Sequence, residues 1–413
     1  MSAIEGSSSG VRQANARDCV LALRAAAGPL SVAELAARTA LSRPTVDSVL
    51  QDLTASGTTV LAATNVARAG QPGRPARRFA LDPSARSVAG VDLGERSVTC
   101  VVTDAAGAEL ARATVPMEGG EPVQAIEHAL RETGAAPAAI GVAVPGIVGA
   151  DGRVAQSLAL PGLVGRDLTH ELENLLEADV VVENDIKLAA LAERHLGPPA
   201  ESIAYVQIGH RISVALIVGG TILQGSHRLA GELGSQRGMR WTSTSRRGRL
   251  TWSTGDTARP LLGRAAAGDS AAQQEIAAFC EEIAPRIATV LLTIDPELVV
   301  VGGGLSREGE TLLGPLRRSL HRLLMTPERP EVVAARLTTD GSLTGALGRA
   351  FEHGSARIAG VPGVPAPWSA FLSASASPGV ELSGPAPSAA DLSVADESPS
   401  NESPGEESVA TSS

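Results

Sequence analysis

Short apolar runs that end at glycines or at acidic corners recur through the middle of this sequence, and they constrain its fold more than any other feature. The runs are AAIGVAVPGIV (138–148), DVVVEND (179–185), SIAYVQIG (202–209), ISVALIVGGTIL (212–223) and PELVVVGGGLS (296–306). Each has the length and the apolar character of a strand buried on both faces, and helical patterns lie between them. The alternation predicts an α/β protein.

An antiparallel meander is expected to open this α/β region. Residues 87–115, SVAGVDLGERSVTCVVTDAAGAELARATV, contain three strand-like runs, punctuated at Gly94 and at residues 104–107. Together with the later strands, the meander predicts two lobes of similar type within residues 83–358.

The N-terminal part follows a different pattern, that of short capped helices. We expect residues 1–12 to be flexible and a helix to run from residue 13 to the Gly28-Pro29 pair. Ser31 with Glu34 forms a capping box for a second helix, and Ser42 caps a third helix whose apolar face is Val46, Val49, Leu50 and Leu53. This arrangement predicts a helix-turn-helix.

Two strand-like runs, TTVLAAT and RRFALD, follow the third helix and are joined by a loop rich in Gly, Pro and Arg. Residues 13–82 therefore have the pattern of a winged helix, a DNA-binding domain. Side chains of the third helix are expected to meet the major groove, and wing arginines to meet a narrow minor groove. The predicted DNA contacts are Ser42, Arg43, Thr45, Ser48, Arg74, Arg77 and Arg78; for the arginines, a solvated surface loop is the alternative.

The distribution of charge agrees with a nucleic-acid-binding N-terminus. The whole chain has a formal net charge of −10, yet residues 10–80 contain nine arginines and only four acidic residues. After Arg357 there are seven acidic residues and no basic ones, and Ser, Pro and Ala dominate, so we expect residues 359–413 to be a disordered acidic tail.

Composition also indicates the cellular compartment in which the protein works. The three cysteines, Cys19, Cys100 and Cys280, are far apart and form no C-x-x-C pair, which argues against a disulfide framework or a cysteine zinc site. No apolar run approaches the roughly 18 residues of a membrane span, and the first 30 residues lack a secretory pattern. We expect a cytoplasmic protein that does not enter membranes.

Five corner motifs, each weak alone, are informative in their order: Asp92-Leu93-Gly94, Pro145-Gly146, Glu183-Asn184-Asp185, residues 230–234 (AGELG) and Gly302-Gly303-Gly304. In this order residues 88–353 resemble the ROK family, which comprises repressors, open reading frames and sugar kinases. The resemblance implies a two-lobed, actin-like (ribonuclease-H-like) fold. With the preceding winged helix, the chain resembles the repressor branch.

The two turns that hold ATP phosphates in the family's kinases are altered in this chain. D-x-G-G-T reads Asp92-Leu93-Gly94-Glu95-Arg96-Ser97, and G-T-G reads Gly209-His210-Arg211. A carboxylate and a bulky cation replace a glycine and a hydroxyl where a nucleotide must approach closely. Only the triple-glycine turn at 302–304 matches the turn on the adenosine side of the family's nucleotide site, and a glycine turn before a helix also has a purely structural explanation. We therefore expect neither ATP as a cofactor nor catalysis.

The sugar side of the motif set is partly retained. The resemblance places Asp185 at the kinases' general base, here vestigial, and assigns contacts with sugar hydroxyls to Asn184, Asp185 and Glu232. Three other family positions differ: Ala159 replaces a sugar-binding asparagine, Ser235 replaces a histidine, and Lys187 replaces a second asparagine. Lys187, the only lysine, either neutralises carboxylates or selects an anionic ligand in the pocket, or it faces solvent on the helix.

The family's structural zinc site is missing from the sequence. The resemblance assigns zinc binding to the histidine at the position of Ser235 and to a C-x-C-G-x-x-G-C run, but no cysteine lies between Cys100 and Cys280. We expect no metal, with Trp241 and Trp252 packing where the metal would be. His210 and His227 lack ligand spacing.

The sequence therefore predicts a transcriptional regulator, a repressor, of carbohydrate-related genes. It is expected to bind double-stranded DNA as a homodimer or dimer of dimers and to respond to a sugar or sugar-phosphate effector. Two alternatives remain open: a dimeric scaffold that binds no ligand, and an ATP-dependent sugar kinase with an appended DNA-binding domain.

Overall fold

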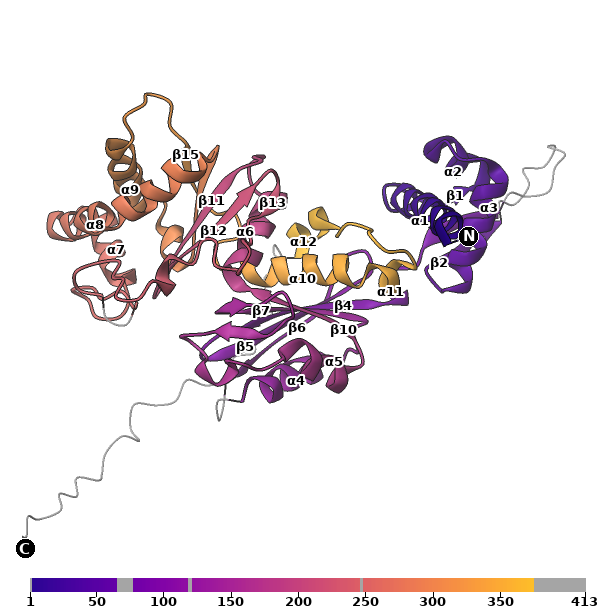
Figure 1. The fold of residues 1–413 in the computed structure, drawn as a ribbon, viewed down its shortest axis with the longest axis horizontal. Helices are drawn as coiled ribbons and strands as arrows, with labels where there is room; N and C mark the ends of the chain where they lie inside the picture. Colours follow the sequence, from indigo (N-terminus) through magenta and orange to yellow (C-terminus); the bar gives the residue numbers. More distant parts are fainter. Residues whose placement is uncertain (1, 65–76, 118–120, 246–247, 375–413) are drawn as a thin grey trace, which may run out of the picture. The chain divides into compact units, whose positions relative to one another are not determined.

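The computed structural model describes residues 2–64, 77–117, 121–245 and 248–374 (Figure 1). Its N-terminal helices are α1 (Ser2–Arg24), α2 (Val32–Thr39) and α3 (Arg43–Ala55). Both predicted caps are confirmed: the Ser31 hydroxyl accepts the Glu34 N–H at 3.3 Å while the Glu34 carboxylate accepts the Ser31 N–H at 2.7 Å. Ser42 caps α3 by accepting the Thr45 N–H.

The first helix starts earlier than its sequence pattern indicated. We expected residues 1–12 to be flexible, but α1 is helical from Ser2. The small polar residues at this end are poor helix formers, yet extending an existing helix by a residue costs much less than nucleating one. The stable half of α1, with Cys19, Val20 and Leu23 buried, supplies that nucleus.

The wing is a small antiparallel sheet in the order β1-β3-β2. Its strands are β1 (Leu30–Ser31), β2 (Thr59–Thr64) and β3 (Arg77–Leu81), so the predicted wing strands are confirmed. The connecting loop, residues 65–76, lies outside the described residues, and with it the predicted contact Arg74. Val46, Val49, Leu50 and Leu53 of α3 are buried as predicted, against α1 and Phe79 of β3.

The first lobe is built on the predicted meander, whose strands are β4 (Ser87–Leu93), β5 (Ser97–Asp104) and β6 (Glu109–Pro116). Strand β7 (Ala139–Val144) pairs parallel with β4, and β10 (Asp179–Asn184) pairs parallel with β7, giving the order β10-β7-β4-β5-β6. Helices α4 (Pro122–Glu132) and α5 (Leu168–Leu176) pack on this sheet, with a short hairpin of β8 (Ile147–Val148) and β9 (Val154–Gln156) beside it.

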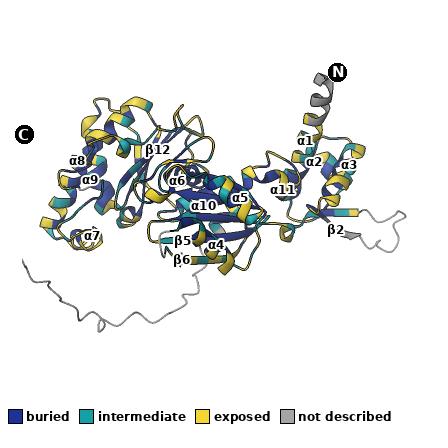
Figure 2. Cartoon of the chain, turned by 60° about the horizontal axis from the view of Figure 1, so that its bottom comes forward, coloured by how far each residue is buried: buried dark blue, intermediate teal, exposed yellow. Residues whose placement is uncertain are grey.

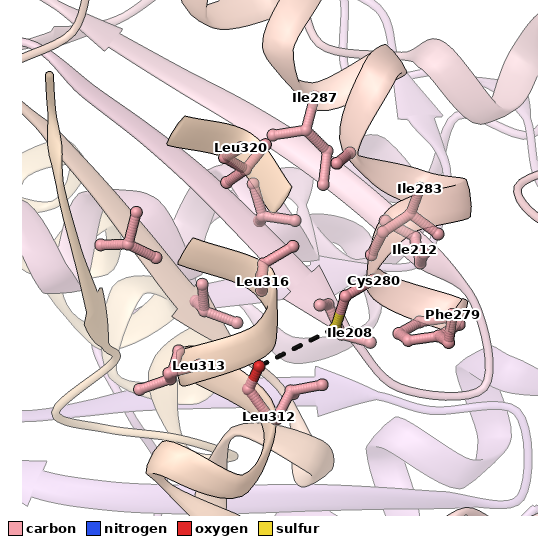
Figure 3. Close-up of a cluster of buried hydrophobic side chains, with 14 of the residues drawn as sticks. Ile208, Ile212, Phe279, Cys280, Ile283, Ile287, Leu312, Leu313, Leu316 and Leu320 are labelled. Carbon is pink, nitrogen blue, oxygen red and sulfur yellow. Dashed lines mark hydrogen bonds between the residues drawn. The ribbon is translucent and has the colours of Figure 1, made fainter. Parts of the chain in front are cut away.

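The second lobe repeats the theme. Its sheet has the order β13-β12-β11-β14-β15, formed by β11 (Ile203–Ile208), β12 (Ile212–Val218), β13 (Thr221–Ile222), β14 (Leu298–Gly302) and β15 (Glu331–Ala334). Helices α7 (Arg259–Ala266), α8 (Ser270–Ile294) and α9 (Glu310–Leu323) pack against it. Figure 3 shows Cys280 and isoleucines of α8 facing leucines of α9 in this core, so Cys280 is a packing residue.

Two helices, α6 (Asp185–Leu196) and α10 (Gly341–His353), pack against each other and connect the lobes. Helix α10 lies on β4 and β7 of the first sheet, while α6 contacts β11 and β12 of the second, and both are mostly buried (Figure 2). Their approach depends on glycine, because a Cβ at Gly345 would lie 2.0 Å from the Leu188 carbonyl oxygen.

The ordered part of the chain extends further toward the C-terminus than we expected, so the prediction of a disordered tail over residues 359–413 is wrong for its first residues. Ala359, Val361 and Val364 are buried in the core of the winged helix, and α12 (Trp368–Ala374) packs on the first lobe. The Trp368 ring stacks on His195 with centroids 4.3 Å apart. A few large apolar side chains outweigh the Pro-rich composition here; residues 375–413 lie outside the described residues.

Within the part of the chain that the structure describes, we find no helix with the length and apolar character of a membrane span.

Candidate functional site

The corner between β10 and α6 carries the two adjacent polar residues singled out in the sequence. Asn184 caps α6: its side-chain oxygen accepts the Lys187 N–H at 2.9 Å, and its amide donates to the Gly146 carbonyl at 2.8 Å. Both contacts fix the corner against the Pro145-Gly146 turn. Asp185, the first residue of α6, accepts the Ile186 N–H on Oδ1 at 2.9 Å and is half-buried.

A cavity of about 240 Å³ opens at this corner. It lies below the range of about 300–1,000 Å³ of pockets for drug-sized molecules, so a ligand the size of a monosaccharide suits it better. The predicted residues Asn184, Asp185 and Glu232 all line it, so the fold brings this set together. Ala159 and Ser235, at positions where the family pattern has other residues, line the same cavity.

Three carboxyl groups interact at this end of the cavity. Burial, with the neighbouring Asp92 carboxyl, raises the pKa of Asp185 to about 8, against the opposing hydrogen bond from Ile186. Burial also raises the pKa of Asp92 to about 6, and that of Glu232 above its usual range. Asp185 therefore holds a proton near neutral pH, and the cavity has both donors and acceptors for hydroxyl groups.

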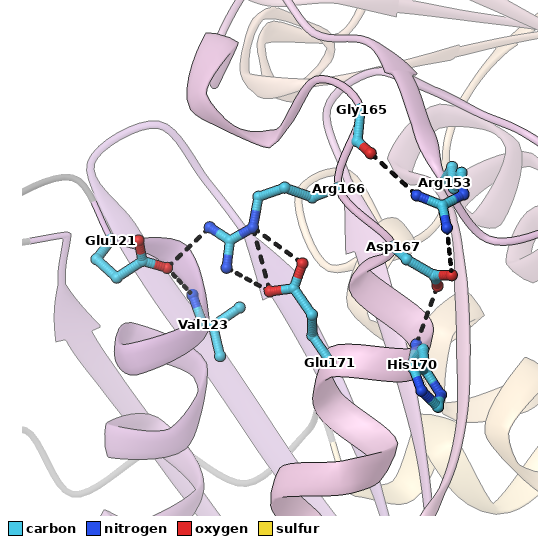
Figure 4. A network of polar contacts seen from close by, with 8 residues as sticks. All are labelled: Glu121, Val123, Arg153, Gly165, Arg166, Asp167, His170 and Glu171. Atoms are coloured by element: carbon cyan, nitrogen blue, oxygen red, sulfur yellow. Dashed lines mark hydrogen bonds and ion pairs between the residues drawn. The ribbon is translucent and has the colours of Figure 1, made fainter.

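One wall of the cavity is the loop from Gln156 to Ala159, and an arginine network supports the chain that follows it. Figure 4 shows Arg166 between Glu121, at the start of α4, and Glu171 of α5. The Arg166–Glu121 distance is 2.9 Å, and this contact lowers the pKa of Glu121. The Ser157 hydroxyl donates to the Pro145 carbonyl at 2.6 Å and so ties this loop to the neighbouring Pro145-Gly146 turn.

Lys187 is buried, with 2% of its surface exposed, so the alternative that it faces solvent is wrong. Its ammonium donates to Gln224 Oε1 at 2.9 Å and to the Arg228 carbonyl at 3.1 Å. Gln224 and Arg228 in turn donate to Glu183 at 2.7 and 3.2 Å. Burial lowers the pKa of Lys187, while Glu183 and Glu232 oppose that effect. No sequence pattern pointed to Gln224 and Arg228, because they lie far from Lys187 along the chain.

The two turns that differ from the kinase pattern both contact the segment that carries Arg249 and Leu250. Glu95, between β4 and β5, accepts from Arg249 of the second lobe at 2.6 Å. Gly209 N–H donates to the Arg211 carbonyl at 3.0 Å, which closes the tight turn between β11 and β12. His210 and Arg211 of that turn line the cavity. An ion pair and two bulky side chains therefore stand at these turns; Arg249 is a residue that sequence reasoning missed.

Packing explains most of the triple-glycine turn. A Cβ at Gly302 would lie 2.0 Å from the Tyr205 hydroxyl, and one at Gly303 would lie 2.5 Å from the Ile208 carbonyl oxygen. Gly303 also has a φ of +86°. These two glycines are required by the fold whether or not a nucleotide binds.

The two tryptophans take the packing positions that the sequence suggested. Trp241 is 2% exposed and joins the second-lobe core, while Trp252 packs on Phe279 with ring centroids 4.6 Å apart.

The N-terminal end of α3 is exposed. Ser42, Arg43 and Ser48 are exposed and Thr45 is half-buried, with the Ser42 and Thr45 hydroxyls 2.8 Å apart. Side chains in this position are free to approach a groove of DNA.

The two described wing arginines are both engaged within the domain. Arg77 pairs with Asp47 of α3 at 2.9 Å, and its side chain is 52% exposed. Arg78 bonds Glu34 at 2.9 Å and the Pro29 carbonyl, so it braces the helix-turn-helix from behind. Of the two, Arg77 is the better placed to exchange its partner for a phosphate.

Comparisons with known proteins agree with this architecture. A model of the ROK family matches residues 88–241 and 235–351, and a model of the IclR helix-turn-helix domain matches residues 19–59. An N-acetyl-D-glucosamine kinase from Yersinia pseudotuberculosis is 26% identical over 246 residues, covering 52% of this chain and 79% of the kinase. An N-acetylgalactosamine kinase from a Shewanella species is 28% identical over 244 residues, covering 52% and 78%.

Solved structures extend the match to the N-terminal domain. A ROK family transcriptional regulator, a homologue of the Escherichia coli Mlc protein, aligns with a TM-score of 0.63 at 19% identity, covering 88% of this chain and 98% of its own. A ROK glucokinase from Streptomyces griseus, bound to glucose and AMPPNP, aligns with a TM-score of 0.56 at 23% identity, covering 64% and 99%. At these identities the likeness establishes the fold.

Proposed function

This chain belongs to the ROK family, and from that premise we propose that it is a transcriptional repressor of carbohydrate-related genes. The observation that carries the proposal is the helix-turn-helix itself: α3 has an exposed, capped N-terminal end, and its domain shares a core with the end of the ROK body. A kinase has no need of such a domain.

In this proposal two copies of the chain place their α3 helices in successive major grooves of a palindromic site. Arg43, Thr45 and Ser48 approach bases and phosphates, with Ser42 fixing the helix end. Arg74 and Arg77 follow the adjacent minor groove. Arg78, tied to Glu34 and Pro29, acts by holding the domain in shape rather than by contacting DNA.

The cavity at Asp185 is the proposed effector site, with Asn184, Asp185 and Glu232 bonding sugar hydroxyls. Helix α10 supplies a physical connection from this cavity to the DNA-binding domain. Ser342, in its first turn, hydrogen-bonds Asp92, and its continuation through α11 (Ser355–Ala359) ends in the winged-helix core at Val364. A ligand that favours one arrangement of the lobes changes DNA affinity by the same coupling free energy.

We propose that the body does not transfer phosphate. Glu95 stands where a kinase needs glycine, and His210 and Arg211 stand in the turn where a kinase needs a hydroxyl and a second glycine. The Glu95 carboxylate is also paired with Arg249 of the second lobe. The retained Asp185 favours the rival interpretation, a sugar kinase with an added DNA-binding domain. A coupled ATP-consumption assay over a panel of neutral and amino sugars separates the two, and turnover that Asp185→Ala abolishes would establish the kinase.

The other rival is a dimeric scaffold without a ligand. Thermal unfolding against the same sugars, with Asp185→Ala in parallel, tests it, because a ligand of the native state raises the midpoint by mass action. A shift that is lost in the variant supports an effector site. No shift with any sugar, while DNA binding is intact, supports the scaffold.

DNA binding is tested by selecting sites from a random duplex library and measuring affinity for the selected duplex. We expect a palindromic site and at least about tenfold weaker binding for Arg43→Ala. Arg286→Gln, which removes an exposed arginine of the second lobe, is the matched control. Arg74→Ala should weaken binding mainly where A·T-rich sequence flanks the site. Equal affinities of the wild type and of all three variants would show that the helix-turn-helix does not contact the DNA.

A further inference from the structure

Arg211 lines the cavity described above, and its guanidinium has an unmet hydrogen-bonding group. Its Nε is buried, and no group in the described part of the chain accepts a hydrogen bond from it. The tight turn that carries Arg211 is held by Gly209 N–H on the Arg211 carbonyl and by Leu250 N–H on the His210 carbonyl, at 3.0 and 2.8 Å. These backbone hydrogen bonds therefore fix the position from which the Arg211 side chain extends.

Positive charge exceeds negative charge around Arg211. Among the described residues, Glu95 and Arg249 are the groups whose charges act on it, and Glu95 is already bonded to Arg249 at 2.6 Å. Two guanidinium groups thus share one carboxylate. Arg211 is half-buried, and withdrawing part of a cation from water without a partner of opposite charge is costly. An anion beside its guanidinium would reduce that cost.

The same cavity contains the hydroxyl-binding set. Asn184, Asp185 and Glu232 line it together with His210 and Arg211. A ligand that reaches both groups needs several hydroxyls and one negatively charged substituent. Arginine suits that substituent, because its planar guanidinium bonds phosphate or carboxylate through two N–H groups.

We propose that Arg211, with His210 beside it, is an anion subsite, and that the effector is a sugar bearing a phosphate or carboxylate group. This inference rests on the proposed effector site and names its ligand class. Neutral sugars occupy only the hydroxyl-binding part of the cavity. Glu95 limits affinity, because its carboxylate occupies Arg249 and repels the incoming anion.

The test is isothermal titration of the full chain with hexose 6-phosphates, hexuronates and the matching neutral hexoses, with inorganic phosphate and ATP as further probes. We expect a charged sugar to bind more tightly than its neutral parent. Arg211→Gln should weaken the charged sugar by roughly tenfold to hundredfold and leave the neutral parent unchanged, as expected for loss of a bond to a charged group. Arg286→Gln, removing an exposed arginine of the same lobe, should change neither.

A second variant moves affinity the other way, so the proposal stays testable even if Arg211→Gln unfolds. Glu95→Gln frees Arg249 and removes the repulsion, so the charged sugar should bind roughly threefold to tenfold more tightly. Unchanged or weaker binding in Glu95→Gln, or equal binding by Arg211→Gln and wild type, overturns the anion subsite.

The remaining outcomes separate this inference from the proposed function. Neutral sugars that bind as tightly as charged ones, with DNA binding intact, sink the anion subsite and leave the sugar-responsive regulator standing. ATP binding that requires Arg211, with no binding of charged sugars, assigns the arginine to a nucleotide and overturns the inference. No binding by any probe contradicts both the subsite and the effector site, whereas the affinity for selected DNA then decides the regulator.

Discussion

Asp185 faces two other carboxyl groups, Asp92 and Glu232, and its raised pKa of about 8 follows from burial and from Asp92. In a kinase such a carboxyl accepts the proton of the attacking hydroxyl. Here it lines a cavity together with His210 and Arg211, and a protonated carboxyl in that position is able to donate a hydrogen bond.

The raised pKa makes stability depend on pH in a defined direction. An unfolded Asp ionises near 3.8 and the folded one near 8, so the native state binds the extra proton between these values and loses stability as pH rises toward 8. Asp185→Asn, which carries no charge, should therefore melt higher than wild type, by about 2 to 4 °C at pH 8.

Thermal melts from pH 6 to 9 check this expectation. The gap between variant and wild type should widen up to about pH 8 and then stay level. A gap independent of pH would mean that Asp185 is ionised throughout in the native protein. Glu173→Gln, a helix-surface carboxyl of α5, is the control and should show little change.

At the scale of elements, the α6–α10 contact holds the two lobes together through small residues. Gly345 meets the Leu188 carbonyl, and Gly341 meets Ala189, so these helices approach more closely than side chains on both would permit. Packed interfaces of this kind are intolerant of added volume.

Gly345→Ala should destabilise the protein by about 1 to 3 kcal/mol or more, because the added methyl group overlaps a backbone oxygen that cannot rotate away. Gly263→Ala is the matched control in α7, where nothing lies within 4 Å of the new Cβ, and it should be neutral or stabilising by about 1 kcal/mol. Urea titration measures both, and a neutral Gly345→Ala would show that the helices are more loosely packed.

At the scale of the whole molecule, the chain returns from the ROK body to complete the DNA-binding domain. Ala359, Val361 and Val364 join a core otherwise made by α1, α2, α3 and the wing. Arg24 of α1 donates to the Pro365 carbonyl at 2.5 Å, which adds a polar tie. The winged helix, which we call the head, and the ROK body are therefore coupled by shared packing as well as by the chain between β3 and β4.

Val364→Ala should destabilise the head by about 1 to 3 kcal/mol, through lost burial and the cavity left behind, and should weaken DNA binding. Val11→Ala, at a 60% exposed position of α1, is the control. Titration with the selected duplex measures the DNA affinity of each variant, and a thermal melt measures its stability. Wild-type behaviour of Val364→Ala would mean that the returning segment adds nothing to the head.

A chain ending at residue 358 should behave like a severe form of the same change, whereas one ending at Ala376 keeps every contact described for this segment. Comparing their DNA affinities also isolates the acidic residues beyond 376. Tighter binding of the longer truncation than of the full chain at low salt would identify those residues as competitors of DNA.

Sequence patterns determined the elements of this protein and the membership of its site. Capping residues and apolar periodicity act over a few neighbours, so Ser31, Glu34 and Ser42 were enough to predict where the helices begin. The order of the motifs predicted that Asn184, Asp185 and Glu232 share one cavity. Only the tertiary structure decided that Lys187 is buried, that Glu95 pairs with Arg249, that Arg211 lacks a partner, and that Val361 and Val364 complete the winged helix. Those outcomes depend on which distant segments share a core or a low-dielectric cavity, and no local pattern encodes that choice.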